Sequence, residues 1–261
     1  MNKIGELYDT LKNINDSKSC LYSIHKNLNY ANSEITNLYD FLVDSFDFKQ
    51  KKSILDCGCG VGFGTLLMAK KLNAKFTGIS VSTTEIESAR ENLEQEKSLQ
   101  NVNFECKSFD DLSAEKYDAI IAIESLKHSP ELSKSLFSVL NSLKKGGEIY
   151  IIEDVLVKDT NSSAAQNLMK DWVLARLYSE KDYTEFSDEM EWSSIDLTPM
   201  MNKYSKLIVA AKIIGAEIKT GIDYLFNKKD SAAYIFRGGF YQEWLYLNGD
   251  LGYKLLIGKK T

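Results

Sequence analysis

The chain has 261 residues, of which 44% are hydrophobic and 26% are charged, and its formal net charge is −5. This balance is that of a globular protein large enough to bury a sizeable core. The negative charge and the scatter of its lysine pairs exclude a nucleic-acid-binding surface, because phosphate contacts need clustered lysine and arginine. No uncharged apolar stretch reaches the length of about 18 residues that a membrane-spanning helix requires.

Four cysteines, at positions 20, 57, 59 and 106, are too few for a disulfide framework in a chain of this length. The N-terminal sequence MNKIGELYDTLKN lacks the apolar segment of a signal peptide. Together these features predict a reducing, cytoplasmic setting. Cys57 and Cys59 have no second ligand pair at zinc spacing, so no metal is expected. The sequence leaves a homo-oligomer open.

The N-terminal region has a helical pattern, with an apolar stripe over residues 32–46, and predicts a helical lid over 1–50. From residue 53 to 157, short apolar runs alternate with amphipathic segments. The expected strands are 53–56, 75–79, 102–106, 117–123 and 148–157, and the expected helices between them are 63–72, 82–99 and 129–147. Strands alternating with helices predict a doubly wound α/β fold with a parallel sheet.

The alternation of strands and helices changes after residue 157. A strand is predicted over 189–198, a helical insert over 199–248 and a last strand over 252–260. The result is a seven-stranded, mostly parallel sheet whose α/β core comprises 51–198 and 249–261. The insert forms a helical cap between the last two strands.

A glycine-rich loop, Asp56-x-Gly58-x-Gly60-x-Gly62, directly follows the first strand of this core. A doubly wound sheet binds its ligand at this edge. A dinucleotide loop would need glycine at position 63 or 65, where the chain has phenylalanine and threonine. A phosphate loop would need a lysine that is missing here. The pattern therefore favours a nucleoside ligand whose approach requires bare backbone.

The segment DCGCGVGFG resembles motif I of the class I S-adenosylmethionine-dependent methyltransferases. YDAIIAIESLKHSPELSKSLFSVLNSLKKGGEIYIIEDVLV is similar to natural-product sugar O-methyltransferases and to sterol and tocopherol C-methyltransferases. FTGISVSTTEIESARENL is similar to the same group and to cyclopropane fatty acid synthases. The resemblance runs from about Tyr30 to Lys260, and it implies the class I methyltransferase fold with S-adenosylmethionine as cofactor.

Two positions depart from the family pattern. Ser80 stands where most class I enzymes have an acid that holds the ribose hydroxyls, and Glu85, one turn into the next helix, is expected to replace it. Ser108, followed by Phe109, stands where many relatives have an aspartate for the adenine amino group. The resemblance implies a cofactor site built from Tyr30, Asp56, Gly58, Cys59, Gly60, Ser80, Val81, Glu85, Ser108, Phe109 and Ile123.

Methyl transfer to a hydroxyl requires the removal of one proton, for which an imidazole of near-neutral pKa is a natural base. In the resembling sugar O-methyltransferases, a Glu-Ser-x-His-His motif and an acid after the fifth strand carry this role. Here His128 keeps the second histidine, Lys127 replaces the first, and Asp154 lies in the fifth strand. We therefore expect His128 and Asp154 to be catalytic. Glu153, on the opposite face of that strand, is a competing carboxylate.

The resemblance places the acceptor pocket under the insert, with Glu124, Tyr241 and Trp244 as pocket residues. Glu124 is expected to brace its loop through a hydrogen bond to backbone or to substrate. Rings at helical spacing also suit ordinary core packing. The insert carries Tyr224, Phe226, Tyr234, Phe236, Phe240, Tyr241, Trp244 and Tyr246.

These features predict a methyltransferase of secondary metabolism that acts on a small, bulky or apolar acceptor at oxygen. One alternative is C-methylation of an isoprenoid or polyketide, with the rings stabilising a cation and His128 or Glu124 removing a proton from carbon. Another, suggested by Ser80 and Ser108, is an S-adenosylmethionine-binding protein without transferase activity. Nucleic-acid and protein acceptors are not expected, because no Asn-Pro-Pro-Tyr type motif follows the fourth strand.

Overall fold

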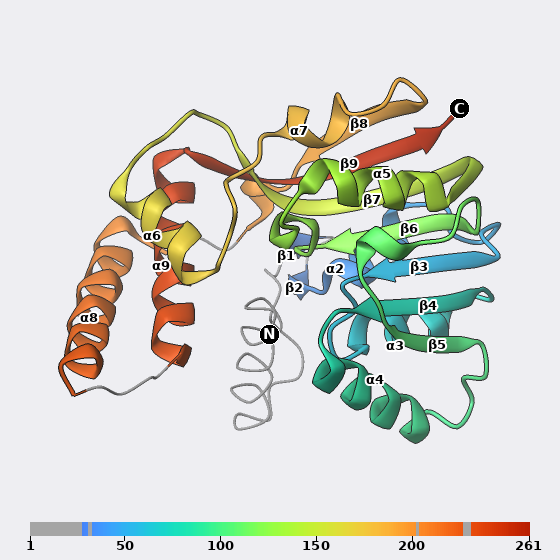
Figure 1. Ribbon diagram of the computed structural model, residues 1–261, viewed down its shortest axis with the longest axis horizontal. Coiled ribbons are helices and arrows are strands. Elements are labelled where there is room, and N and C mark those ends of the chain that lie inside the picture. The colour runs from blue at the N-terminus through green and yellow to red at the C-terminus, as the bar shows by residue number, and fades with distance from the viewer. Residues whose placement is uncertain (1–27, 31–32, 202–203, 227–230) are drawn as a thin grey trace.

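The computed structural model describes residues 28–30, 33–201, 204–226 and 231–261 (Figure 1). A seven-stranded sheet has the order β5-β4-β3-β6-β7-β9-β8, and β9 runs antiparallel to its neighbours β7 and β8 while the other pairs are parallel. This arrangement confirms the doubly wound, mostly parallel sheet. Its strands are β3 (Ser53–Cys57), β4 (Lys75–Ser80), β5 (Val102–Cys106), β6 (Tyr117–Ile123), β7 (Leu143–Leu156), β8 (Met190–Asp196) and β9 (Leu251–Lys260).

Helices connect the strands and cover the sheet. Ser82 begins α4 as its N-cap, accepting a hydrogen bond from the backbone N–H of Glu85 at 3.2 Å. Short 3₁₀ turns, η1 (Phe109–Asp111), η2 (Leu126–His128) and η3 (Thr198–Met200), lie in the loops. The α-helices are α2 (Leu38–Ser45), α3 (Phe63–Lys71), α4 (Thr83–Gln95), α5 (Leu132–Ser142), α6 (Ser163–Asp171), α7 (Glu180–Thr184), α8 (Lys206–Leu225) and α9 (Ser231–Asn248).

The N-terminal region differs from the predicted helical lid. Residues Leu28–Tyr30 (β1) and Ser33–Thr36 (β2) form an antiparallel pair, and the helix predicted over 32–46 begins only at Leu38. Asn37 caps that helix by accepting a hydrogen bond from the backbone N–H of Tyr39. Side-chain capping at Asn37 thus set the start of the helix, which the apolar stripe alone did not reveal. Residues 1–27 lie outside the described part of the chain.

The helix predicted over 129–147 is also shorter than expected. It spans Leu132–Ser142, and the backbone becomes extended at Leu143, so that Gly146 and Gly147 lie inside β7. The glycine pair therefore does not end the helix. Ser129 still begins the segment by accepting a hydrogen bond from the backbone N–H of Glu131.

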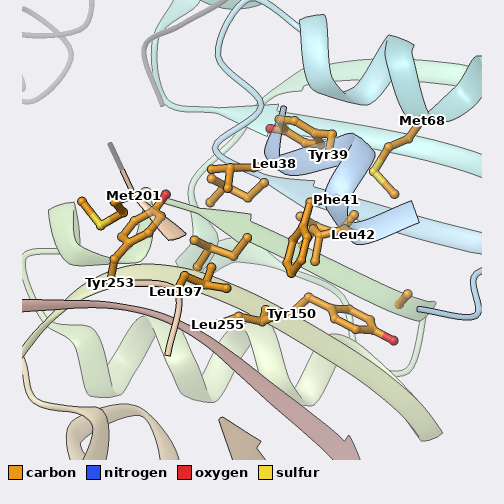
Figure 2. Close-up of a cluster of buried hydrophobic side chains, with 14 of the residues drawn as sticks. Leu38, Tyr39, Phe41, Leu42, Met68, Tyr150, Leu197, Met201, Tyr253 and Leu255 are labelled. Atoms are coloured by element: carbon orange, nitrogen blue, oxygen red, sulfur yellow. The ribbon is translucent and has the colours of Figure 1, made fainter. Parts of the chain in front are cut away.

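Helix α2 covers the face of the sheet opposite α5 and completes the core there. Leu38, Phe41 and Leu42 are almost fully buried and pack with Tyr150 of β7 and Leu255 of β9 (Figure 2). The other face is covered by α5, whose Leu136 and Val139 are fully buried. Because both faces of the sheet are covered, the loops at the carboxyl ends of its parallel strands are the surfaces left to form a site.

The cap lies beyond one end of the sheet (Figure 1). Helices α8 and α9 pair with each other, and α9 packs on α6. Within the described residues, none of the helices is both long and apolar enough to cross a bilayer.

Candidate active site

The loop after β3 is built from left-handed backbone. Gly58, Gly60 and Gly62 have φ values of +85°, +52° and +80°, which side chains rarely tolerate. The N–H groups of Gly58 and Cys59 donate to the carbonyl of Ile79 at 2.9 and 3.0 Å, so the loop is fastened to the end of β4. The predicted glycine loop is therefore a fixed turn at the carboxyl edge of the sheet.

The three glycines face different surroundings. A Cβ on Gly58 would lie 2.5 Å from Cβ of Ser125, and one on Gly62 would lie 2.6 Å from the Phe104 ring. A Cβ on Gly60 would meet only the Glu85 carboxylate, at 3.9 Å. Gly58 and Gly62 are thus required by protein packing, whereas Gly60 borders the open side of the loop, where a ligand can approach the backbone.

Glu85 completes this open side. Its Oε2 accepts a hydrogen bond from the Ser80 hydroxyl at 2.6 Å, and both residues are buried. The Ser80 hydroxyl also accepts from the backbone N–H of Ser82 at 3.1 Å. The structure therefore places a carboxylate beside the end of β4, although the strand itself ends in serine. That Glu85 holds the ribose hydroxyls of a cofactor stays a prediction from the sequence.

Asp56 lies at the base of the glycine loop, almost fully buried. Its Oδ2 accepts hydrogen bonds from the hydroxyls of Thr65 at 2.6 Å and Tyr39 at 3.5 Å. Burial, followed by the charge of Asp56, raises the pKa of the thiols of Cys57 and Cys59, so both remain uncharged. Asp56 thus ties the loop to α3 and α2.

The remaining predicted cofactor residues lie along the same edge of the sheet. Ser108 caps η1 by accepting from the backbone N–H of Asp110 at 3.2 Å, and Phe109 is half-buried against the core. Val81 follows β4, and Ile123 ends β6 as a buried side chain. Tyr30 ends β1, but its side chain lies outside the described part of the structure.

A buried lysine dominates the loop after β6. The Nζ atom of Lys127 lies 2.5 Å from Asp154 Oδ2 and 3.8 Å from an oxygen of each of Glu124 and Glu153. It also lies 5.3 Å from the centre of the Trp172 ring. Burial lowers the pKa of Lys127, but the charges of Asp154 and Glu124 outweigh it and hold the pKa above its ordinary value. Lys127 therefore carries a fixed positive charge.

Asp154 joins this lysine to the cap. Its Oδ2 also accepts from the side-chain amide of Gln242 at 2.5 Å, and its Oδ1 accepts from the hydroxyl of Tyr246. Gln242 and Tyr246 are one turn apart on α9, so both face the same carboxylate. Asp154 thus has three donors from two elements. A small pocket beside it is lined by Lys127, Asp154, Leu168, Trp172, Leu174, Arg176, Leu177 and Tyr178.

Glu153 lies on the opposite face of β7 from Asp154 and is fully buried. Its Oε1 accepts from the backbone N–H of Lys127 at 3.2 Å. Burial outweighs the nearby lysine charge and raises its pKa to about 8. Glu153 is consequently protonated at neutral pH, while its neighbour faces the cap.

His128 ends η2 and is half-buried. Burial, followed by the charge of Lys127, lowers its pKa to about 3, although Glu124 and a hydrogen bond with the Trp172 backbone act in the opposite direction. The near-neutral pKa expected from the sequence is therefore wrong, because the ring is buried and Lys127 places a cation beside it. His128 contacts the backbone of Trp172, whereas Asp154 contacts Lys127.

The predicted pocket residues have separate positions. Glu124 adopts a φ of +48° and accepts a hydrogen bond from the hydroxyl of Tyr253 at 2.7 Å, so it braces its loop through a side chain of β9. Tyr241 is buried and donates to Glu217, while Trp244 is half-buried on α9. Three other rings of the insert are exposed instead: Tyr224, Phe226 and Phe236.

We call Glu124, Glu153 and Asp154, which surround Lys127, the acid cluster. Sequence reasoning missed three side chains that contact it: Gln242, Tyr246 and Tyr253. The signal for Lys127 was present, because a charged residue lies between Leu126 and His128 in an otherwise buried loop. Buried lysines are rare unless they are paired. In the described residues, no group of three or more histidine, cysteine, aspartate or glutamate side chains has the arrangement of a metal site.

The chain matches known proteins over most of this core. A family model described as a methyltransferase domain matches residues 48–212. The methyltransferase GfsG of Streptomyces halstedii is 30% identical over 48% of this chain and 45% of the relative. The sterol 24-C-methyltransferase of Debaryomyces hansenii is 24% identical over 79% of this chain and 50% of the relative. This chain thus spans about half the length of the curated relatives it matches.

Solved structures share the fold at low identity. The [4+2]-cyclase SpnF matches with a TM-score of 0.75 and 20% identity, covering 98% of this chain and 94% of that chain. The geranyl diphosphate C-methyltransferase of Streptomyces coelicolor, solved with S-adenosyl-L-homocysteine, matches with a TM-score of 0.67 and 14% identity, covering 96% and 92%. At these identities the likeness shows the architecture alone.

Proposed function

The chain belongs to the methyltransferase domain family, and from that membership we propose that the protein transfers a methyl group from S-adenosylmethionine to the hydroxyl of a small, apolar, natural-product-like acceptor. When bound, this cofactor supplies a methyl group activated by a sulfonium. The residues at the carboxyl edge fit such a ligand: Gly60 leaves its backbone open, and Glu85 presents a buried carboxylate beside it. The hydroxyls of a ribose can donate hydrogen bonds to such a carboxylate.

The observation that carries the proposal is the attachment of η2 to the glycine loop. Ser125, just before η2, donates a hydrogen bond to the Cys57 carbonyl at 2.7 Å. The same residue lies in the space that a side chain at Gly58 would fill. His128 is therefore held on a loop that abuts the cofactor loop, and its imidazole is neutral at pH 7 because its pKa is lowered to about 3.

Asp154 is held by several donors. Its oxygens accept from Lys127, Gln242 and Tyr246. We propose that Asp154 orients the acceptor side of the site, while His128 accepts the hydroxyl proton. We assign these separate roles because Asp154 and His128 contact different partners.

C-methylation is a second candidate, favoured by the carboxylates around Lys127. Glu124, with the hydroxyl of Tyr253, and Asp154, with that of Tyr246, bring negative charge and rings together. Such surroundings stabilise a carbon-centred cation. The match to a sterol 24-C-methyltransferase over most of this chain supports the same chemistry. A cytoplasmic role in secondary metabolism is part of either proposal.

The test is the release of S-adenosylhomocysteine by the purified chain with two matched acceptor sets. One set holds hydroxylated polyketide and terpenoid scaffolds, and the other holds the corresponding olefins without hydroxyls. Turnover confined to hydroxylated acceptors supports O-methylation, and turnover on the olefins supports C-methylation. Binding of S-adenosylmethionine in calorimetry with no turnover in either set would overturn both in favour of a binding protein.

A further inference from the structure

Helix α8 carries an apolar stripe on the side that faces away from the protein. Figure 1 shows α8 at the outer edge of the cap, with α9 between it and the sheet. At 3.6 residues per turn, Leu207, Ala211, Ile214, Ile218, Ile222 and Leu225 lie on one face. Of these, Leu207, Ile214, Ile218 and Leu225 are 81%, 61%, 58% and 79% exposed.

The inward side of α8 makes both apolar and polar contacts, because Val209 is buried and Ile213 packs on the core. Thr220 and Asp223 are buried, and Glu217 forms an ion pair with Arg237 of α9 at 3.1 Å. Arg237 also pairs with the buried Asp171 at 2.7 Å, which fixes the helix pair on α6. The ion pairs of Arg237 with Glu217 and Asp171 therefore set the orientation of α8, and the apolar stripe of α8 faces outward. A stripe about 30 Å long without a charged residue is unusual on an exposed helix.

Lysines flank this stripe. The described residues 204–226 contain three lysines and two acidic residues, and Lys219 pairs with Asp223 at 2.9 Å. Lys206 contacts the side-chain oxygen of Asn248, and Lys212 lies 4.0 Å from the centre of the Tyr204 ring, so both side chains lie along the edges of α8. Tyr204 and Phe226 lie exposed at its two ends. Aromatic ends, lysine edges and an apolar stripe match the boundary between headgroups and acyl chains.

We propose that the outer face of α8 docks the protein onto an anionic lipid surface, with the helix lying in the plane of the membrane. A second copy of the chain fits this face less well, because a two-fold axis along the stripe would bring the same lysines together. An anionic bilayer instead offers opposite charge to the edges and hydrocarbon to the stripe. The proposal is independent of the acceptor and of the chemistry of the site.

The test is flotation of the full-length chain with vesicles of phosphatidylcholine and phosphatidylglycerol at a 7:3 ratio, compared with phosphatidylcholine alone. Binding is expected to the anionic vesicles and to weaken with added salt. Ile214→Glu with Ile218→Glu should reduce binding about tenfold or more, because two inserting side chains become charged. Phe137→Glu, at an equally exposed ring on α5, is the matched control and should bind as the unaltered chain does.

Unchanged melting temperature and unchanged calorimetric binding of S-adenosylhomocysteine establish that the double variant is folded. The proposal is overturned by absence of binding to anionic vesicles, or by equal binding to neutral ones. It is also overturned if light scattering shows a dimer that the α8 substitutions dissociate, since the stripe would then be covered by a second copy.

Discussion

The ammonium group of Lys127 and the carboxylate of Asp154 lie 2.5 Å apart in the interior, and this contact joins the core to the cap. Lys127 belongs to η2, which follows β6, and Asp154 lies in β7. The same carboxylate accepts hydrogen bonds from Gln242 and Tyr246 of α9. One buried ion pair thus couples the loop that carries His128 to α9 of the cap.

Lys127→Met should destabilise the fold strongly. It leaves Asp154 buried without its cation, and removing one partner of a buried pair costs about 3–5 kcal/mol. The free energy of unfolding from urea titration measures this loss. The double variant Lys127→Met/Asp154→Asn should lose less than the sum of the single changes, because it leaves no unpaired charge at this contact. Strictly additive losses would show that the two side chains do not interact.

Glu153 should make stability depend on pH. Burial raises its pKa to about 8 from an ordinary value near 4.5, so the folded state keeps a proton that the unfolded chain releases. The stability that the protonated Glu153 side chain contributes is present below about pH 4.5, declines between about pH 4.5 and 8 and is lost above about pH 8. Glu153→Gln should therefore be as stable as the unaltered chain at pH 5. At pH 8 its free energy of unfolding should be higher by an amount on the order of a few kcal/mol, and its melting temperature should rise accordingly.

Melting curves at both pH values test this difference, and Glu191→Gln on the exposed side of β8 provides the control. Glutamine keeps the oxygen that accepts from the Lys127 backbone, so the hydrogen bond survives the change. A gain at pH 8 shared by the control, or none in Glu153→Gln, would contradict a buried proton at this position.

The doubly wound, mostly parallel sheet was accessible from the sequence because each element carries a local signal. The alternation of apolar runs and helices, and the glycines after β3, need only neighbouring residues to be read. The acid cluster required contacts between distant parts of the chain: Lys127 and Asp154 are 27 residues apart, and Gln242 is 88 residues beyond Asp154. No periodic pattern records such a pairing.

Two predicted features failed for physical reasons that are local. The stripe over 32–46 suggested one helix, but the cap at Asn37 starts the helix late and the residues before it pair as strands. His128 was expected to titrate near neutrality, yet burial of the ring, and then the charge of Lys127, lowers its pKa to about 3.

His128 should remain neutral across the physiological range. Its pKa is lowered to about 3, first by burial and then by the charge of Lys127. In a His25→Gln background, the ¹⁵N shifts of the remaining imidazole should not move between about pH 5 and 8. The unfolded chain takes up this proton near pH 6.5, so the stability that His128 contributes is lost as pH falls below that value.

His128→Ala should lower kcat by about 10²–10⁴-fold if the imidazole accepts the hydroxyl proton, and leave the affinity for S-adenosylhomocysteine unchanged. An acceptor identified in the turnover screen allows the measurement. A near-normal kcat in this variant would remove the base role and favour the C-methylation alternative.

The contact between Ser80 and Glu85 predicts the effect of restoring the common family acid. The Ser80 hydroxyl lies 2.6 Å from Glu85 Oε2, with both side chains buried, so Ser80→Asp brings two carboxylates together. Like charges at this distance force one group to take up a proton, which distorts the ligand-facing carboxylate. The affinity for S-adenosylhomocysteine should fall about tenfold, the equivalent of one hydrogen bond to a charged group.

Glu85→Gln should weaken binding by a similar factor, because an amide accepts hydrogen bonds less strongly than a carboxylate. The exchange Ser80→Asp/Glu85→Ser returns the site to one carboxylate and one hydroxyl, and should recover most of the affinity lost in Ser80→Asp. Isothermal titration of all three variants against the unaltered chain makes the comparison, with melting temperatures as the folding control. If Ser80→Asp binds more tightly than the unaltered chain, Glu85 is not the carboxylate that faces the ligand, and the acid at the end of β4 has that role instead.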